Sequence, residues 1–195
     1  MDDRVLDDRI VDDSVVGDSI VDGSAPRESA GKIVGMEALL DWVRDTRARG
    51  ETIAFANGCF DILHVGHVRY LRASAEEADR LIVALNDDKS VEQLKGAGRP
   101  ILPATARAEL VAALKPVDRV IVFSETTVAD LLRAIEPDVH CKGTDYTVDS
   151  VPEREIVRAY GGRIAIVGDP KNHSTRDLLA RIASGQAQAG PASQP

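Results

Sequence analysis

The chain has 195 residues, and its 24 Lys and Arg side chains against 32 Asp and Glu give a formal net charge of −8. That length suits one domain of ordinary size with tails, and the acidic balance disfavours nucleic acid as a partner. No apolar run approaches the ~18 residues of a membrane-spanning helix, no basic and apolar leader opens the chain, and two cysteines make neither a disulfide framework nor a zinc spacing. We therefore expect a cytoplasmic protein with no membrane partner.

The two ends of the chain differ in composition from its middle. Residues 1–24 hold eight Asp and two Arg, a charge of −6, and their apolar pairs recur every five residues. A period of five matches neither a helix nor a strand, so no single face collects the apolar side chains. We predict a disordered acidic tail over residues 1–31, with a partner-binding segment as the alternative. A folded domain is predicted over residues 32–183 and a second disordered tail over residues 184–195.

Between the tails, segments with helical spacing alternate with short apolar runs that are typical of buried strands. The predicted helices are 36–49, 65–78, 105–114, 127–135, 153–160 and 174–183, and the predicted strands are 52–59, 80–86, 118–124, 138–142 and 163–167. This alternation indicates a single doubly wound, Rossmann-like α/β domain, with a five-stranded parallel sheet and helices on both faces. In such sheets, ligands bind at the carboxyl ends of the strands.

The turn after the first predicted strand, NGCFDILHVGH at residues 57–67, carries the strongest chemical signal. Gly58 permits a tight turn, and His64 and His67 are three residues apart, so they share one face where the helix begins. A helix N-terminus attracts anions, two imidazoles add hydrogen-bond donors, and Gly66 leaves room for a ligand. The pattern favours a phosphate site over two capping histidines, and a metal pair would lack a third ligand.

Two further clusters follow predicted strands. In KGAGRP, Lys95 and Arg99 flank glycines, and such a flexible loop can fold over phosphates and neutralise them; an exposed basic loop is the alternative. In KGTDY, Lys142 can reach a phosphate and Gly143 admits a close ligand. Asp145 could orient substrate hydroxyls or a metal-bound water, whereas a plain strand-to-loop turn is the structural alternative.

The remaining polar candidates have ordinary structural explanations as well. Ser174 and Thr175 open the last predicted helix, where both are good capping residues. His140 falls inside a predicted strand and is interpreted as a core histidine. Cys59 and Cys141 are interpreted as small buried residues, because no neighbouring base in the sequence marks either as a nucleophile.

The segment GCFDILHVGH resembles the HxGH signature of the cytidylyltransferase-like nucleotidyltransferase superfamily. Together with LKGAGRP, TARAELVAALKPVDRVIVF, KGTDY and HSTRDLL, it is similar to the adenylyltransferase domain of ADP-heptose synthase. The resemblance runs from about Lys32 to Ile182. It implies that AMP passes from ATP, bound with Mg²⁺, to D-glycero-β-D-manno-heptose 1-phosphate, with release of pyrophosphate.

The resemblance also implies roles for single residues. His64, His67 and Lys95 would be catalytic, stabilising charge on the triphosphate. The residues expected to bind the nucleotide or its phosphates are Asn57, Gly58, Phe60, Gly66, Arg107, Lys142, Gly143, Ser174 and Thr175. Asp61 and Asp145 are candidates for substrate contacts, and no residue is assigned to a metal. The chain departs from the family at Arg176, where heptose relatives usually carry a second Thr, and at Lys171, the nearest cation where related cytidylyltransferases carry Arg.

A separate sugar kinase is expected to supply the sugar 1-phosphate, because 195 residues leave no room for a kinase domain. The resemblance is compatible with a homo-oligomer. One alternative keeps the chemistry but uses CTP and glycerol 3-phosphate or another alditol phosphate. An alternative of a different class is an inactive nucleotide-binding module, against which the intact His64, His67, Lys95 and Lys142 argue.

Overall fold

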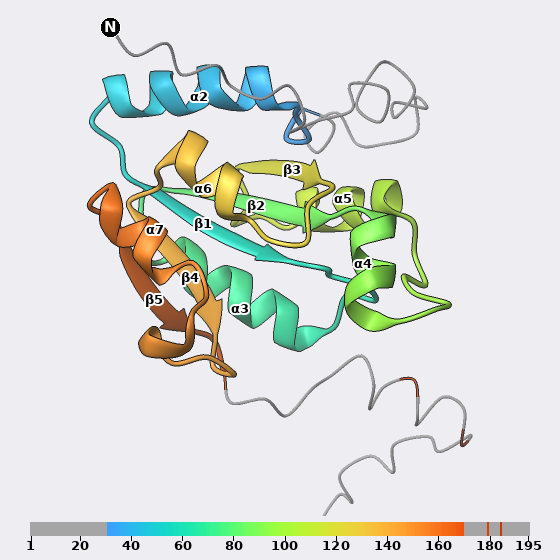
Figure 1. Ribbon diagram of the computed structural model, residues 1–195. Coiled ribbons are helices and arrows are strands. Elements are labelled where there is room, and N and C mark those ends of the chain that lie inside the picture. The colour runs from blue at the N-terminus through green and yellow to red at the C-terminus, as the bar shows by residue number, and fades with distance from the viewer. Residues whose placement is uncertain (1–30, 170–178, 180–183, 185–195) are drawn as a thin grey trace, which may run out of the picture.

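Five short apolar segments form one parallel sheet in the computed structural model, which describes residues 31–169 together with residues 179 and 184. The strand order across the sheet is β3-β2-β1-β4-β5 (Figure 1). The strands are β1 (Ile53–Gly58), β2 (Arg80–Asn86), β3 (Arg119–Phe123), β4 (Val139–Gly143) and β5 (Arg163–Val167). The predicted five-stranded parallel sheet is confirmed, with every strand boundary within one residue of its expected place.

Helices cover both faces of the sheet, as the doubly wound pattern predicted. On one face lie α3 (Val65–Ala75) and α5 (Ala104–Ala112). On the other face lie α2 (Met36–Ala48), α6 (Ala129–Ile135) and α7 (Arg154–Ala159). Figure 1 shows α2 and α6 on the side of the sheet opposite to α3.

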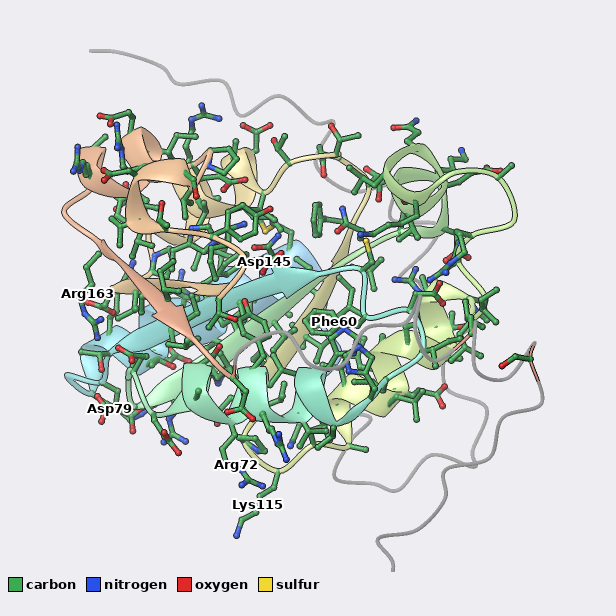
Figure 2. The ribbon with its side chains drawn as sticks, turned by 90° about the horizontal axis from the view of Figure 1, so that it is seen from below. Phe60, Arg72, Asp79, Lys115, Asp145 and Arg163 are labelled. Carbon is green, nitrogen blue, oxygen red and sulfur yellow. The ribbon has the colours of Figure 1, made fainter. Side chains whose placement is uncertain are left out.

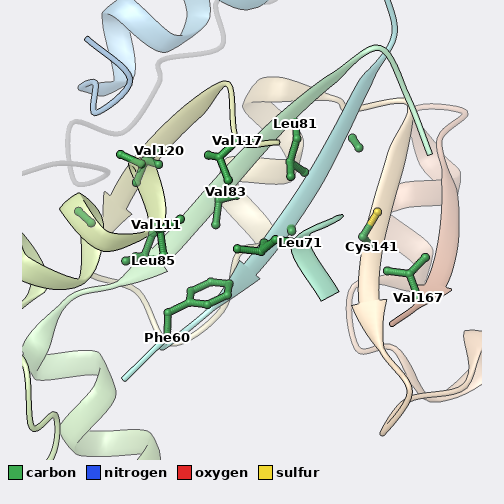
Figure 3. Close-up of a cluster of buried hydrophobic side chains, with 14 of the residues drawn as sticks. Phe60, Leu71, Leu81, Val83, Leu85, Val111, Val117, Val120, Cys141 and Val167 are labelled. Atoms are coloured by element: carbon green, nitrogen blue, oxygen red, sulfur yellow. The ribbon is translucent and has the colours of Figure 1, made fainter. Parts of the chain in front are cut away.

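Two separate hydrophobic cores result, because successive side chains of a strand point to opposite faces of the sheet. In β2, Leu81 and Val83 join Leu71 of α3 in one core, which is drawn in Figure 3. Ile82, between them in the sequence, joins Leu39 of α2 in the other core. All five side chains are 0% exposed. Strand β2 is therefore buried on both faces, as parallel strands usually are.

One helix was not predicted: α4 (Asp88–Lys95) follows β2, where the chain was expected to lead directly into the glycine-rich loop. The Asp87 carboxylate caps α4 by accepting a hydrogen bond from the Ser90 backbone N–H at 2.7 Å. Gly96, with φ 95°, ends it. Both signals are visible in the sequence, but Val91 is the helix's one buried apolar side chain. The caps are therefore not accompanied by the apolar periodicity from which a helix is usually predicted.

Several predictions fall on other parts of the chain. The predicted tails and the predicted helix 174–183 lie outside the described residues, apart from residues 31, 179 and 184. Among the helices that the structure describes, none is long and apolar enough to cross a membrane. A single 3-10 turn, η1 (Val148–Ser150), lies between β4 and α7 in the described range.

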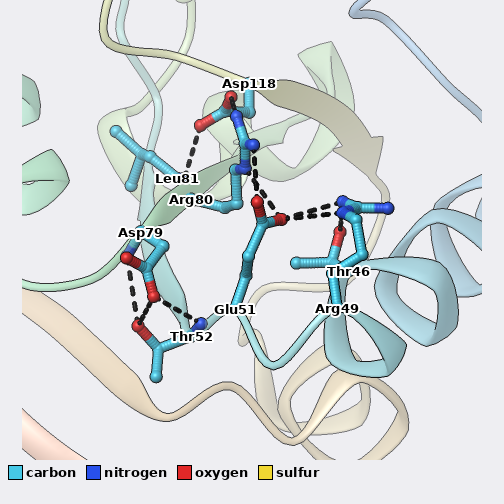
Figure 4. A network of polar contacts seen from close by, with 8 residues as sticks. All are labelled: Thr46, Arg49, Glu51, Thr52, Asp79, Arg80, Leu81 and Asp118. Carbon is cyan, nitrogen blue, oxygen red and sulfur yellow. Dashed lines mark hydrogen bonds and ion pairs between the residues drawn. The ribbon is translucent and has the colours of Figure 1, made fainter.

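Charged side chains at the amino ends of the strands form a network of ion pairs (Figure 4). Glu51 accepts hydrogen bonds from Arg80 and from Arg49, each at 2.8 Å. Arg80 also pairs with Asp118 at 3.3 Å, and the Asp118 carboxylate accepts the backbone N–H of Leu81 at 2.8 Å. The charged side chains at this edge of the sheet thus pair with one another.

The strand order places a switch point between β1 and β4. From β1 the chain adds β2 and then β3 on one side, and afterwards returns to place β4 and β5 on the other side of β1. The crossovers therefore leave β1 in opposite directions, and in sheets of this kind a crevice lies at the carboxyl ends of the two central strands. Phe55 of β1 lies in register with His140 of β4, so the last residues of both strands meet at this crevice.

Candidate active site

A stacked pair of histidines stands where α3 begins. His64 is the N-cap residue, and its carbonyl accepts a hydrogen bond from the His67 backbone N–H at 2.9 Å, so the first turn brings both side chains to one face. Their ring centroids lie 3.9 Å apart with 24° between the planes, and the Phe60 ring lies 5.3 Å from that of His67. Phe60, labelled in Figure 2, and Ile62 both have positive φ, at 46° and 59°. Strained backbone of this kind is common at functional sites.

The environment of His67 favours an uncharged ring. Burial, and to a smaller extent the neighbouring His64, lowers the pKa of His67 from 6.5 to about 4. At neutral pH the ring therefore carries one N–H donor and one acceptor nitrogen. Its Nδ1 is buried and finds no hydrogen-bond partner among the described residues. A buried polar atom without a partner is costly, so this ring is suited to a partner that arrives with the ligand.

Across the crevice, Lys142 lies at the carboxyl end of β4 and is only 7% exposed. Its Nζ donates to Oδ1 of Asn57, at the end of β1, at 3.0 Å and lies 3.4 Å from Oε2 of Glu153. The Tyr146 ring centroid lies 5.4 Å from the same Nζ. Nε2 of His140 approaches Oδ1 of Asn57 at 3.3 Å. The structure thus brings together Asn57 and Lys142, both predicted site residues, with three residues that were not predicted for the site: His140, Tyr146 and Glu153.

A side chain at either of two glycines of the site would meet a close neighbour. A Cβ at Gly143 would lie 2.8 Å from Oδ1 of Asp145, and a Cβ at Gly58 would lie 3.2 Å from the Phe60 ring. The first contact is shorter than real Cβ atoms show, so Gly143 lets the Asp145 carboxylate fold back over the end of β4. Asp145 itself is exposed at the edge of the crevice.

Asp61 braces two loops against each other, a role that the sequence pattern did not indicate. Its carboxylate is buried, with 4% of the residue exposed. It accepts hydrogen bonds from the backbone N–H groups of Ile101 and Leu102, at 2.8 and 3.2 Å, and from Nε of Arg99 at 2.6 Å. The Arg99 charge, expected to meet phosphate, is therefore paired within the protein. The substrate contact of Asp61 stays a prediction, beside a structural use that accounts for its burial.

Arg107 has a similar structural use. The residue is 0% exposed, and its guanidinium donates to the carbonyls of Cys59 and Leu102, at 2.5 and 3.0 Å, and to Asp88 at 2.7 Å. Each of its three nitrogens is thus engaged in joining the end of β1 to α4 and to the loop before α5. A contact with phosphate stays a prediction that would require part of this arrangement to open.

Lys95 lies at the end of α4 and is exposed. Its charge, followed by that of Arg107, acts to lower the pKa of the Cys59 thiol. Burial has the larger influence and raises that pKa, so the thiol stays protonated. Cys141 is buried as predicted, whereas Cys59 is only half-buried, because it follows β1 at the edge of the sheet. The Sγ donates weakly to Oδ1 of Asn86 at 3.9 Å.

Ser174 and Thr175 lie outside the described residues, as do Lys171 and Arg176. The segment that leads to them is tied to the site at Asp169. Its carboxylate pairs with Arg69 of α3 at 2.6 Å, and its carbonyl accepts from the Thr144 hydroxyl at 2.8 Å. The exit from β5 is therefore attached both to the histidine-bearing helix and to the loop after β4.

Glu153 is the residue that the sequence pattern missed most clearly. It is 7% exposed, which is unusual for a glutamate, and it precedes α7 by one residue. Nothing local marks it, since its partner Lys142 lies eleven residues away across the β4–α7 connection.

The described residues contain no group of three or more His, Cys, Asp or Glu side chains placed to hold a metal ion. Paired imidazoles at the start of a helix and a buried ammonium at a strand end are groups that can bind phosphate oxygens. Residues 55–180 match the family model described as Cytidylyltransferase-like. That match covers well over half of the chain, and the protein belongs to the cytidylyltransferase-like family of nucleotidyltransferases.

Similar proteins are known in bacteria and archaea. Bifunctional protein HldE of Pseudomonas fluorescens (strain Pf0-1) is 50% identical over 150 residues, which cover 77% of this chain and 32% of that protein. HldE of Methylobacillus flagellatus is 45% identical over 155 residues, with 80% and 32% covered. The chain thus spans about a third of the length of these relatives. The crystal structure of the lipopolysaccharide core biosynthesis protein from Thermoplasma volcanium GSS1 has a TM-score of 0.54 and 28% identity, covering 62% of this chain and 100% of that one.

Proposed function

We propose that the protein transfers AMP from ATP to a sugar 1-phosphate, D-glycero-β-D-manno-heptose 1-phosphate, and so makes ADP-heptose and pyrophosphate. Three findings support the proposal: the family match, the identity of about half with the HldE relatives, and the likeness to a lipopolysaccharide core biosynthesis protein. The motifs around the crevice, above all KGTDY, favour the heptose branch within that family.

The proposed step is an in-line displacement at the α-phosphorus of ATP. An oxygen of the sugar phosphate forms the new bond to phosphorus, while the bond from phosphorus to the bridging β-oxygen breaks and pyrophosphate leaves with that electron pair. The attacking phosphate is already anionic, so the protein needs no nucleophile of its own. Catalysis then consists of positioning and of stabilising charge that shifts in the transition state.

The observation that carries the proposal is the stacked pair His64 and His67, half-buried beside Phe60 at the start of α3. These rings would donate to oxygens of the triphosphate, together with the backbone N–H groups of the first helical turn. Lys142 and Asn57 lie on the other side of the crevice, where a second phosphate group could bind. Mg²⁺ would arrive with ATP, coordinated by phosphate oxygens, as part of the substrate.

The supply of the acceptor is part of the proposal. The sugar 1-phosphate would come from a sugar kinase. Assembly into a homo-oligomer is a further proposal and does not bear on the chemistry of the crevice.

An assay of pyrophosphate release tests the proposed function directly. ATP, CTP, GTP and UTP are each combined with the heptose 1-phosphate, with other sugar 1-phosphates and with glycerol 3-phosphate. We expect the highest kcat/KM for ATP with the heptose 1-phosphate. Faster turnover of CTP with glycerol 3-phosphate would replace the proposal with the alditol phosphate alternative. Nucleotide binding without turnover in any combination would support an inactive module.

A further inference from the structure

Four polar side chains form a cluster between the two central strands, named here the Lys142 cluster: Asn57 on β1, His140 and Lys142 on β4, and Glu153 before α7. His140 is 0% exposed, and Lys142 and Glu153 are each 7% exposed. Nζ of Lys142 lies 3.0 Å from Oδ1 of Asn57 and 3.4 Å from Oε2 of Glu153. A positive charge and its counter-charge are therefore both held out of water at the switch point.

The side chain of Glu153 interacts with Lys142 and not with the helix that it precedes. It occupies the N-cap position of α7, yet its side chain makes no capping hydrogen bond to that helix. Among the residues that the structure describes, none donates a hydrogen bond to Oε2 of Glu153, and the charge that faces this oxygen is Nζ of Lys142 at 3.4 Å. A buried charge is costly unless an opposite charge lies beside it. The Glu153 carboxylate is thus withdrawn from water and does not cap α7, and its one charged partner in the cluster is Lys142.

The other side of the cluster orients Asn57. Burial, and then the charge of Lys142, lowers the pKa of His140 to about 3, so this ring is neutral at pH 7. Oδ1 of Asn57 lies between Nζ of Lys142 and Nε2 of His140, at 3.0 and 3.3 Å. Because an amide oxygen only accepts, both nitrogens carry the hydrogens. The amide group of Asn57 is therefore held in one orientation, with its oxygen toward β4.

Several groups face Lys142 from the elements around it. They are Glu153 before α7, Asp145 and Tyr146 in the loop after β4, His140 on β4, and Asn57 on β1. His140 and Asn57 are uncharged, Tyr146 presents a ring face, and Asp145 is exposed to water. Burial lowers the pKa of Lys142, while Glu153 first and Asp145 second act to raise it. Glu153 is the one buried carboxylate of this set.

We propose that Glu153 is a positioning residue that keeps Lys142 protonated and fixed against Asn57, so that the ammonium can bind a phosphate group of a substrate. This inference rests on the proposed function, in which Lys142 contacts phosphate. Without the Glu153 charge, the buried amine would lose its proton at a lower pH, and a neutral amine cannot neutralise a phosphate. Glu153 itself needs no contact with the substrate.

A titration of Lys142 tests the electrostatic part without any assay of turnover. Lysines labelled with ¹³C at Cε are followed by NMR, and the Lys142 signal is assigned by its loss in Lys142→Met. Glu153→Gln is expected to lower the pKa of Lys142 by at least about one unit. The matched control is Glu155→Gln on α7, because that glutamate is exposed and pairs with Arg154 and Arg158. An unchanged Lys142 pKa in Glu153→Gln would overturn the proposal.

Glu153→Asp covers the case in which Glu153→Gln does not fold. The shorter side chain moves the carboxylate back by one methylene, so the pKa of Lys142 should lie measurably below its wild-type value. An equal pKa in Glu153→Asp and wild type would contradict the proposed pairing.

The pH profile of pyrophosphate release tests the functional part. In Glu153→Gln the alkaline limb of kcat/KM should move to lower pH by as much as the pKa of Lys142 moves, and Glu153→Asp should recover part of the shift. Equal loss at every pH would assign Glu153 a purely structural role and overturn the proposal. If the wild type releases no pyrophosphate with any substrate pair, the proposed function fails. The NMR titration still decides whether Glu153 controls Lys142.

Discussion

The two edges of the parallel sheet use polar residues in opposite ways. At the amino edge, Asp79 accepts the backbone N–H and the hydroxyl of Thr52 at 2.8 and 2.7 Å, and Glu51 is shared between two arginines (Figure 4). Those groups stand near water and satisfy one another. At the carboxyl edge, the half-buried His67 has an Nδ1 without a partner among the described residues, and so does the buried His140, which lies inside β4 and reaches Asn57 at the end of β1. One edge is complete without a ligand, whereas the other has hydrogen-bonding capacity left over.

This contrast separates stability from function within one sheet. Paired charges at an exposed edge add little to the free energy of unfolding. Their carboxylates accept hydrogen bonds from the first N–H groups of the strands, however, and so help to define where the strands begin. Imidazoles whose buried nitrogens lack hydrogen-bond partners lower stability. Proteins retain such groups mostly where they serve function, for example by binding a ligand. Substitutions at the two edges should therefore affect different measurements.

The largest effect is expected for His67→Ala. An imidazole donor that meets charge developing in the transition state typically contributes about 10²–10³ in rate, or roughly 3–4 kcal/mol. ATP affinity should change much less, because other donors share the ground-state binding. The measurements are kcat by pyrophosphate release and the Kd of ATP by calorimetry. Arg72→Ala, on the exposed side of the same helix, is the control. A loss of less than about tenfold in kcat would make His67 a capping residue.

Arg107→Met should reduce stability rather than substrate binding alone. Removing this 0% exposed guanidinium leaves the carbonyls of Cys59 and Leu102 without their donors and Asp88 without its partner. We expect the free energy of unfolding to fall by about 1–3 kcal/mol in the absence of nucleotide. Denaturant titration measures this change. Unaltered stability with a weaker Kd for ATP would show instead that Arg107 serves phosphate.

Comparison of these residues shows what could be predicted from the sequence. The strands and the histidine pair were predictable because their signals are local: continuous apolar runs, and two imidazoles three residues apart next to a predicted strand end. Asp61, Arg107 and Glu153 could not be placed in the same way. Each acquires its role from a partner on another element, as Glu153 does from Lys142 at 3.4 Å.

Helix α4 is an intermediate case. Its caps, Asp87 and Gly96, were present in the sequence, but the apolar periodicity on which helix prediction mainly depends was too weak to reveal it. The glycine-rich segment was correctly seen as a loop, while its charges were misjudged in part. Arg99 looked available for phosphate because its buried partner, Asp61, lies 38 residues earlier in the chain.

As the pH falls, the histidines near the carboxyl edge should reduce the free energy of unfolding before the carboxylates of the amino edge do. The pKa of His67 is lowered in the folded protein to about 4 and that of His140 to about 3. The unfolded chain, with histidine pKa values near 6.5, therefore binds more protons than the folded one below that pH. Stability is then full above about pH 6.5 and falls as the pH drops toward 4. Denaturant titrations at several pH values should show a shallower fall for His67→Gln than for wild type, and identical slopes would contradict the half-buried, neutral ring.

The smallest effect is expected for Glu51→Gln, at the amino edge. Arg80 and then Arg49 hold the pKa of this carboxyl at about 2, below its ordinary 4.5. Its stabilising contribution is therefore present above pH 4.5 and is lost between about 4.5 and 2. Water screens such exposed pairs, so the thermal midpoint of Glu51→Gln should lie only slightly below that of wild type at pH 7. This small gap should close as the pH falls toward 2.

Turnover by Glu51→Gln should match that of wild type, because the substitution lies at the edge of the sheet opposite to the histidine pair. The kcat for pyrophosphate release and the Kd of ATP, measured beside the thermal midpoints, give the comparison with His67→Ala. A clear loss of kcat in a variant of nearly wild-type stability would mean that the strands transmit a change from one edge to the other. The two edges could then no longer be treated as independent, and the contrast between a self-paired edge and a ligand-binding edge would have to be abandoned.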